Sequence, residues 1–346
     1  MAGVLRIAQL APVAMPVRPG EGDSIEQLVS LLCEELVRRG HEVTLFATGD
    51  SVTSSRLISA YPRGYTQDPE LWDWRFHEVM HAAWAFEHAA EFDLIHSHDY
   101  HFALPFTRLV DTPVLTTYHT SIDPDVIRAL HRYPQAHLVA TSEFQRRSLA
   151  GIAEVPVVNH GIDTAAFPFG PSPGDYLLFL GRMIAEKGPV DAVHIAREAG
   201  VRLVMAGPGD DYFDTAVAPL VDGRDVEYVG RVSSAERNRL LAGAAALLFP
   251  VSYPEPFGLV MIEAMACGTP VAATSLGAVP EIVEPGVTGH HADSPDRLAG
   301  LIPATVSLDR GTVRDRAAAR FDFHQMVDRY EELYAGIVRG ATEGAR

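Results

Sequence analysis

Two carboxylates flank one short apolar segment in the second half of the chain. Glu255 and Glu263 lie eight residues apart in "PEPFGLVMIEAMACG", where an apolar run predicts a helix that begins near Phe257 or Gly258 and stops before Gly268. A carboxylate near a helix start is ordinary, because the N-terminal dipole favours negative charge. A second carboxylate inside an apolar helix, more than one turn further on at about 1.5 Å per residue, needs a ligand or an ion-pair partner.

A sugar nucleotide has the layout that this segment could bind. The backbone amides of Phe257, Gly258 and Leu259 at the helix start form an anion site. Ionised carboxylates accept paired hydrogen bonds from vicinal hydroxyls, so Glu255 and Glu263 could bind the sugars at the two ends of a diphosphate. The sequence leaves open the alternative that Glu263 is only salt-bridged and Glu255 is exposed.

Two cations occur in a second candidate loop. The segment "FLGRMIAEKG" follows a predicted strand and contains Arg182 and Lys187, with Gly181 and Gly188 making its backbone permissive. Two cations beside free helix amides suit a diphosphate; the alternative is a solvated loop with two surface charges. Lys187 is the single lysine among 28 basic residues, which favours a need for a compact ammonium at this position.

The elements around these loops alternate between strand and helix, which predicts parallel sheets. A cluster of proline and glycine at 167–174 separates two such series. We therefore predict an α/β protein with two doubly wound Rossmann-like domains facing a central cleft, because ligands bind at the carboxyl ends of such sheets. The predicted strands are 5–12, 41–49, 93–98, 113–119, 136–142, 155–163, 176–181, 201–207, 226–230 and 246–251, and the predicted helices are 24–40, 71–90, 188–200, 213–221, 234–244 and 321–340.

Composition excludes several classes of protein. The 346 residues are 47% hydrophobic and 21% charged, as in ordinary globular proteins. A net charge of −17 argues against a nucleic-acid partner and weakens a case for anionic lipid. No run is apolar enough to predict an integral membrane segment, and the N-terminal stretch is interpreted as a strand and not as a signal peptide. Cys33 and Cys267 are expected to be buried free thiols in a reducing cytosol.

Several blocks in the second half resemble those of the retaining GT-B glycosyltransferases of family 4. The segment from Glu255 to Glu263 is similar to their E-x7-E motif, and "FLGRMIAEKG", "VNHGID", "VEYVGRV" and "ACGTPVAATSLGAVPEIV" follow the family's order and spacing. The resemblance implies domains at 1–166 and 167–325, with a final helix at 326–346 that crosses back to the first domain. It implies that Gly181, Arg182 and Lys187 contact the donor diphosphate, with the amides of Phe257, Gly258 and Leu259 as further donors. It implies that Glu263 binds the ribose and that Glu255 binds the donor sugar. It places Arg231 and Val232 at the base.

The first half is similar to the family but departs from it at one loop. The segment "TTYHT" matches the family's active-site histidine, so His119 is expected to contact the sugar or the leaving phosphate. Where the family carries a glycine pair, this chain has Asp23 and Ser24 after Gly22, and these residues are the expected acceptor side. His160 stands where asparagine is usual.

The function implied by the resemblance is transfer of a hexose from a nucleoside-diphosphate sugar, with UDP favoured over GDP. The expected catalytic residues are Glu255, His119, Arg182 and Lys187. Acceptor attack and departure of the nucleoside diphosphate would share one face of the sugar, so Glu255 is not cast as a nucleophile. The acceptor is unidentified, a soluble molecule is favoured, and the expected location is cytoplasmic. No metal or other cofactor is expected, and the sequence does not indicate the oligomeric state.

Three other functions compete with this interpretation. A sugar-nucleotide epimerase on the same architecture would bind the donor without an acceptor, and a catalytically silent module would bind it without turnover. The segment "HSHDYH" supplies His96, His98 and His101, which could be ligands in a zinc hydrolase, although Asp99 stands one position early for that pattern. The acidic segment at 123–125 is interpreted as a turn and helix start and not as a metal–nucleotide motif.

Overall fold

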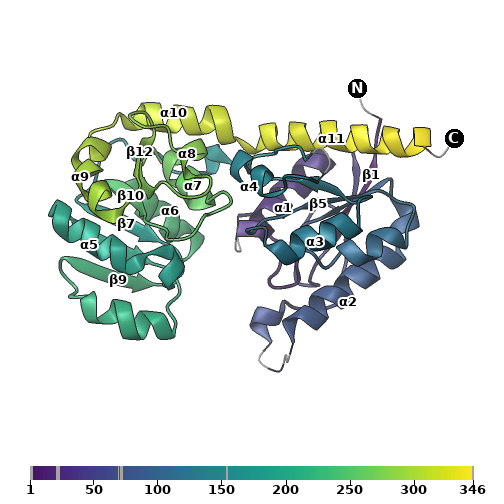
Figure 1. The fold of residues 1–346 in the computed structure, drawn as a ribbon, viewed down its shortest axis with the longest axis horizontal. Coiled ribbons are helices and arrows are strands. Elements are labelled where there is room, and N and C mark those ends of the chain that lie inside the picture. The colour runs from purple at the N-terminus through teal and green to yellow at the C-terminus, as the bar shows by residue number, and fades with distance from the viewer. Residues whose placement is uncertain (1–2, 21–23, 69, 71–72, 153–154, 345–346) are drawn as a thin grey trace. The chain divides into compact units, whose positions relative to one another are not determined.

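The computed structural model describes residues 3–20, 24–68, 70, 73–152 and 155–344, and the chain forms two compact units (Figure 1). Unit 1 comprises Met1–Gly161 and Phe323–Arg346, and unit 2 comprises Ile162–Asp322. The unit boundaries thus differ by a few residues from the domain limits of 166 and 325 expected from sequence. Within the described ranges, no helix is both long and apolar enough to span a bilayer.

Unit 1 contains a parallel sheet whose six described strands have the order β3-β2-β1-β4-β5-β6. Its central strands β1 and β4 are buried along almost their whole length, as expected of a parallel sheet that is covered on both faces. The strands are β1 (Arg6–Leu10), β2 (Glu42–Phe46), β3 (Arg56–Ile58), β4 (Leu94–Ser97), β5 (Val114–Thr117) and β6 (His137–Val139), and the α-helices are α1 (Ser24–Arg38), α2 (Trp74–Glu87), α3 (Pro124–Arg132), α4 (Glu143–Ser148) and α11 (Phe323–Gly344).

Unit 2 repeats this topology, since its described strands have the order β12-β11-β10-β7-β8-β9. Its core lies between the sheet and the helices α5 and α9. The strands are β7 (Tyr176–Leu180), β8 (Arg202–Ala206), β9 (Val226–Gly230), β10 (Ala246–Phe249), β11 (Val271–Thr274) and β12 (Gly289–Ala292), and the α-helices are α5 (Pro189–Ala199), α6 (Ser234–Gly243), α7 (Leu259–Ala266), α8 (Val279–Ile282), α9 (Pro295–Val306) and α10 (Arg310–Phe321).

This strand order fixes where each unit can bind a ligand. The first strand of each unit lies beside the fourth, so the direction of winding reverses between β1 and β4 and between β7 and β10. Ligands of doubly wound sheets bind outside the carboxyl ends of the strands at that switch point. The loops after β7 and β10 are therefore the first place to look in unit 2, and both carry candidate residues.

Two predicted elements are wrong. The strand expected at 155–163 forms only two isolated bridges, Ala140 with Val157 and Ile162 with Asp322, because this segment leaves unit 1 and enters unit 2. The helix expected at 213–221 is a π-helical turn, Phe213–Val217, followed by a 3₁₀ turn, Ala218–Leu220. Pro219 lacks the amide hydrogen that a continuing α-helix would need.

Two helix starts follow directly from aspartate caps. Helix α2 begins at Trp74 because the Asp73 side chain accepts a hydrogen bond from the amide of Arg75, so it is shorter than the helix expected at 71–90. Asp123 accepts from the amides of Asp125 and Val126 at 2.8 and 2.9 Å. The acidic segment at 123–125 is thus a helix start, as predicted.

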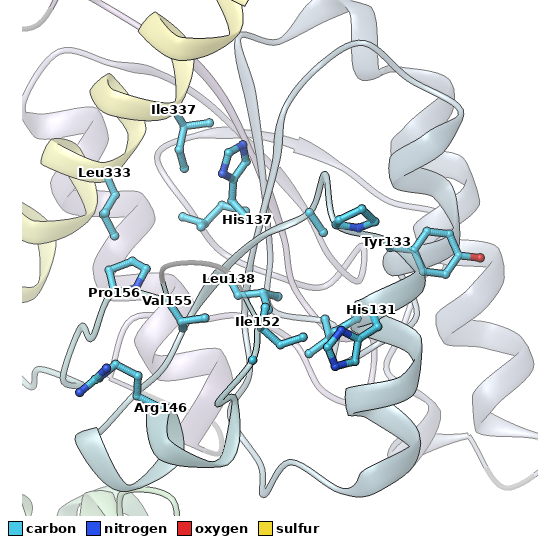
Figure 2. Close-up of a pocket in the computed structure, with 15 residues that line it drawn as sticks. His131, Tyr133, His137, Leu138, Arg146, Ile152, Val155, Pro156, Leu333 and Ile337 are labelled. Atoms are coloured by element: carbon cyan, nitrogen blue, oxygen red, sulfur yellow. The ribbon is translucent and has the colours of Figure 1, made fainter.

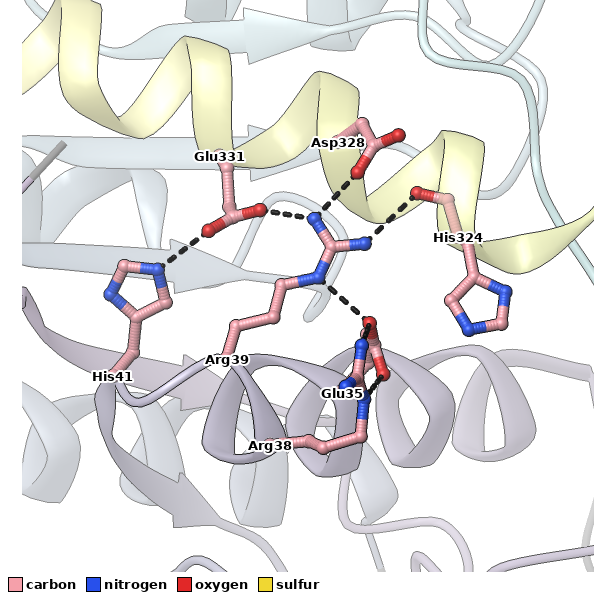
Figure 3. Close-up of polar contacts among 7 residues, drawn as sticks. All are labelled: Glu35, Arg38, Arg39, His41, His324, Asp328 and Glu331. Atoms are coloured by element: carbon pink, nitrogen blue, oxygen red, sulfur yellow. Dashed lines mark hydrogen bonds and ion pairs between the residues drawn. The ribbon is translucent and has the colours of Figure 1, made fainter. Parts of the chain in front are cut away.

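The last helix belongs to unit 1 because an arginine after α1 binds it at several points (Figure 3). Arg39 donates to Asp328 at 2.6 Å, to Glu331, and to the backbone oxygen of His324, all on α11. The same guanidinium donates to the buried Glu35 of α1 at 2.8 Å. One side chain therefore compensates three carboxylates at the contact between the two helices.

Replacing Arg39 with alanine should lower the free energy of unfolding by about 2–3 kcal/mol, because Glu35 and two acidic side chains of α11 lose a shared cation. Urea unfolding of Arg39→Ala and of Arg38→Ala provides the comparison. Among the described residues Arg38 pairs with Glu35 alone, and its side chain is 67% exposed, so its removal should cost about 0–1 kcal/mol. Equal losses in the two variants would contradict the role assigned to Arg39.

Candidate functional site

The loops that follow β7 and β10 pack directly on each other. Gly188 has φ +72°, and a Cβ at that position would lie 2.0 Å from the backbone oxygen of Pro250. Two residues further on, the amide of Ser252 donates to the backbone oxygen of Glu186 at 2.9 Å. The backbone therefore holds the two candidate loops together at the switch point of the unit 2 sheet.

This packing brings Lys187 and Glu255 into contact. The Nζ atom of Lys187 lies 2.6 Å from Oε2 of Glu255 and 2.7 Å from the hydroxyl of Tyr253, which in turn donates to the same carboxylate oxygen. The side chains of Lys187 and Glu255 are only 19% and 13% exposed, so neither is a solvated surface charge. Sequence reasoning missed Tyr253, and its only signal was a phenol two residues before a candidate carboxylate.

A third loop, after β11, fixes the backbone of Glu255. The amide of Ala278 donates to the Glu255 backbone oxygen at 2.9 Å. Gly277 has φ +63°, and a Cβ there would lie 2.4 Å from the Glu255 backbone nitrogen, so only glycine allows this approach. The position of Glu255 is thus set by loops that follow two neighbouring strands, β10 and β11.

Helix α7 begins next to this group, as the sequence predicted. Gly258, with φ +88°, precedes its first residue, Leu259. Amides in the first turn of a helix have no carbonyl of that helix to bind, so those of Gly258 and Leu259 can receive an anion. Phe257 is buried and packs edge-on against Phe321, with ring centroids 6.1 Å apart.

Glu263, inside α7, has a partner that sequence reasoning did not identify. Its carboxylate lies 3.5 Å from a guanidinium nitrogen of Arg237 on α6. Burial raises the pKa of Glu263, and the positive charge of Arg237 acts in the opposite direction. The ion pair that the sequence left open therefore exists, and the expected role of Glu263 at a ribose stays a prediction.

The remaining candidate residues of unit 2 lie on the loops after β7 and β9, and Gly207 after β8 contacts the backbone of both loops. A Cβ on Gly207 would lie 1.9 Å from the backbone oxygen of Gly181, and the Gly207 amide donates to the backbone oxygen of Gly230 at 2.8 Å. Arg231 directly follows, so the loops after β7, β8 and β9 share one edge of the sheet. Arg182, Arg231 and Val232 lie on these loops, with both arginines exposed and Val232 half-buried.

The Tyr253 hydroxyl is affected electrostatically by both Glu255 and Arg182. Burial and the negative charge of Glu255 raise the pKa of Tyr253, while the positive charge of Arg182 acts in the opposite direction. Arg182 is therefore close enough to this group to act on it electrostatically. Within the described part of the chain, its guanidinium makes no hydrogen bond or ion pair.

His119 lies in unit 1, half-buried between two buried histidines, His98 and His160. Its Nε2 is 3.0 Å from Nδ1 of His98, and its Nδ1 is 3.4 Å from Nε2 of His160. His98 continues the row to the side-chain oxygen of Gln9 on β1 at 3.0 Å. Burial lowers the pKa of His119 to about 3, so at neutral pH this ring is an uncharged hydrogen-bonding group.

The histidines of "HSHDYH" do not converge as a metal site would require. His96 bonds Thr117 at 2.8 Å and Tyr334 at 2.7 Å in the interior, whereas the side chain of His101 is exposed. Across the described ranges, no group of three or more metal-ligating side chains gathers. The zinc-hydrolase hypothesis thus loses the set of ligands on which it depended.

Most of the expected acceptor side lies outside the described residues. Gly22 and Asp23 lie outside the described residues, and Ser24 is the first residue of α1, with nothing described of its side chain. The prediction that these three residues contact an acceptor stays a prediction.

Unit 1 also has a largely apolar cavity of about 890 Å³ near the first residues of β5 and β6 (Figure 2). The candidate histidines His98, His101 and His119 lie instead beyond the carboxyl ends of β4 and β5. None of the residues proposed from the sequence lines this cavity. Its lining includes Leu115, His131, Tyr133, His137, Leu138, Arg146, Ile152, Leu333 and Ile337.

Comparison with known proteins matches both halves of the chain. The family profile described as Glycosyltransferase Family 4 matches residues 25–166, and the profile described as Glycosyl transferases group 1 matches residues 174–308. Glycogen synthase of Mycobacterium tuberculosis is 30% identical over 295 residues, which cover 72% of this chain and 70% of that protein.

Solved structures of glycosyltransferases have the same arrangement of elements. AviGT4, a glycosyltransferase involved in avilamycin A biosynthesis, is 26% identical, with a TM-score of 0.74 and coverage of 97% of this chain and 98% of AviGT4. HepE of Anabaena, solved in complex with UDP and glucose, is 18% identical, with a TM-score of 0.73 and coverage of 96% and 100%. At that identity the likeness to HepE shows the fold alone.

Proposed function

This chain belongs to family 4 of the glycosyltransferases and has their GT-B fold, and we propose that it transfers a hexose from a nucleoside-diphosphate sugar with retention of configuration. One observation carries the proposal. The only lysine of the chain and the first carboxylate of the E-x7-E segment meet at 2.6 Å, where the unit 2 sheet changes winding direction. A donor with an anionic centre and hydroxyls at its ends suits that pair.

In this proposal the site acts mainly on the departing diphosphate. Lys187, Arg182 and the amides of Gly258 and Leu259 stabilise the negative charge that develops on its oxygens. The loops that carry these groups are already held together by backbone contacts, so little rearrangement of the backbone is needed as the bond to the sugar breaks. Cations and amides supply the compensation that a metal ion gives elsewhere, and on this ground we propose a reaction without a cofactor.

The carboxylates and His119 are proposed to orient the sugars. Glu255 accepts hydrogen bonds from the hexose, and Glu263 accepts them from the ribose hydroxyls, while Arg231 and Val232 lie beside the base. His119, uncharged at neutral pH, bonds the hexose or the leaving phosphate. We propose that the acceptor attacks the face from which the diphosphate departs, with no covalent intermediate on Glu255.

The donor base, the acceptor and the cellular location are each proposed from a single separate observation. The family resemblance favours UDP over GDP. The names of the relatives refer to glycogen and to avilamycin A, so they do not converge on one acceptor, and the net charge of −17 favours a soluble molecule over an anionic lipid. Cys33 and Cys267 are free and buried, which supports a reducing, cytoplasmic location.

A thermal-shift screen with UDP, GDP, ADP and TDP tests the donor proposal. One nucleotide should raise the unfolding temperature, because a ligand at 100 times its Kd stabilises the folded state by about 2.7 kcal/mol. The matching sugar nucleotide, incubated with candidate acceptors, should then give a product with the donor's anomeric configuration by NMR. Stabilisation by none of the four contradicts the proposal, and an epimerised sugar formed without acceptor would favour an epimerase.

A further inference from the structure

Tyr253 bridges the two charged groups of the candidate site. Its hydroxyl donates to Oε2 of Glu255 and accepts from Nζ of Lys187 at 2.7 Å. The same Nζ lies 5.0 Å from the centroid of the Tyr253 ring, a distance at which the ring attracts a cation. Oε2 of Glu255 therefore has two donors, and its Oε1 receives none from the described part of the chain.

In the proposed function, Glu255 and the donor diphosphate compete for the same Lys187 ammonium. A donor diphosphate needs the Lys187 ammonium, which Glu255 already holds at 2.6 Å. When the diphosphate takes the ammonium, a carboxylate that is only 13% exposed loses its cation. A buried charge without compensation is costly, so a second donor must stay on Glu255 if the diphosphate is to compete well.

We propose that Tyr253 is a positioning residue of the donor site, and this inference rests on the proposed function. Its hydroxyl holds Oε2 of Glu255 while Lys187 turns to the diphosphate, and Oε1 stays available to a sugar hydroxyl. The backbone contacts between the loops after β7, β10 and β11 are unaffected by this exchange, so only the ammonium has to move.

Calorimetric titration with UDP, GDP, ADP and TDP of four proteins tests the proposal: wild type, Tyr253→Phe, Glu255→Gln and the double variant. Tyr253→Phe keeps the ring but leaves Lys187 as the main partner of Glu255, so the Kd of the bound nucleotide should rise about five- to tenfold. Glu255→Gln removes the competing charge and should lower the Kd a few-fold. In that background, Tyr253→Phe should change the Kd less than about twofold, because the two effects are coupled.

Tyr176→Phe is the matched control, since its hydroxyl donates to the backbone oxygen of Leu240 at 2.8 Å in the same unit, away from the proposed site. Its Kd should equal that of wild type. An unchanged Kd in Tyr253→Phe, or the same loss in both backgrounds, would overturn the positioning role and indicate packing alone. If the wild type binds none of the four nucleotides, the proposed function is wrong and this inference fails with it. If the wild type binds one of them and Tyr253→Phe leaves that Kd unchanged, only the role of Tyr253 is wrong.

Discussion

Replacing Lys187 with alanine should lower turnover by about 10²–10³ and leave the protein folded. The expected loss is that of removing one preorganised donor from a developing negative charge, about 2.7–4 kcal/mol. The fold should persist because Lys187 lies on a loop outside the core of unit 2, and Tyr253 still donates to Glu255 in its absence. Lys187→Arg should recover little, since a planar guanidinium cannot replace a compact ammonium packed on the Tyr253 ring.

Initial rates with saturating donor, together with circular dichroism of each variant, check this prediction. Arg202→Ala is the control, because Arg202 forms a partly exposed ion pair with Glu227 on the outer strands of unit 2, outside the proposed site. That variant should keep wild-type turnover. Near-normal transfer by Lys187→Ala would show that the leaving diphosphate is stabilised by other groups.

Unit 1 should lose stability steeply when the pH falls below about 6.5. Five histidines in this unit have lowered pKa values, mainly because burial disfavours the charged ring; four of them are buried and His119 is half-buried. In the unfolded chain they take up protons near pH 6.5, whereas in the folded unit they stay neutral to much lower pH. Each therefore removes about 1.4 kcal/mol of stability per pH unit below 6.5 until its folded pKa is reached. These histidines are His81, His96, His98, His119 and His160.

Two buried carboxyl groups act in the opposite direction. Burial raises the pKa of Glu78 to about 7 and raises that of Asp99, so the folded unit binds these protons before the unfolded chain does. They add stability as the pH falls from about 7 toward 4.5, where the unfolded carboxyls also titrate. Five histidines against two carboxyls leave a net loss of about 4 kcal/mol per pH unit, enough to unfold a domain of ordinary stability near pH 5.

Tryptophan fluorescence can follow this transition in unit 1 alone, since all three tryptophans of the chain lie before residue 162. Urea unfolding at a series of pH values should give a free energy that falls with acidification below pH 6.5. His81→Leu removes one of the five proton acceptors, so it should make that dependence shallower by about 1.4 kcal/mol per pH unit. A stability that stays constant from pH 7 to pH 5 would contradict the neutral state assigned to these rings.

The sequence predicted what depends on local pattern. Alternation of apolar runs and capped helices gave the parallel α/β architecture, and the apolar run after Pro256 placed the start of α7 near Phe257 or Gly258, close to its first residue, Leu259. The candidate loops could be placed because both follow strands. The strand predicted at 155–163 was wrong because an apolar run does not reveal that the chain passes from unit 1 to unit 2 there.

Contacts between distant residues could not be predicted in the same way. The approach of Lys187 to Tyr253 depends on β7 and β10 being neighbours, although two α-helices and two strands separate them in the chain. Arg237 reaches Glu263 only because α6 and α7 pack together. The row from Gln9 through His98 to His119 needs the registers of three strands, which no local spacing encodes.

The return of α11 to unit 1 has a consequence for synthesis on the ribosome. Unit 2 is one continuous stretch, Ile162–Asp322, whereas unit 1 stays incomplete until the final residues have been translated. Tyr330 and Tyr334 are buried in unit 1, where they bond Thr117 and His96. Although unit 1 begins first, unit 2 is therefore the first unit whose whole chain has been synthesised, and nascent unit 1 must wait for its missing helix.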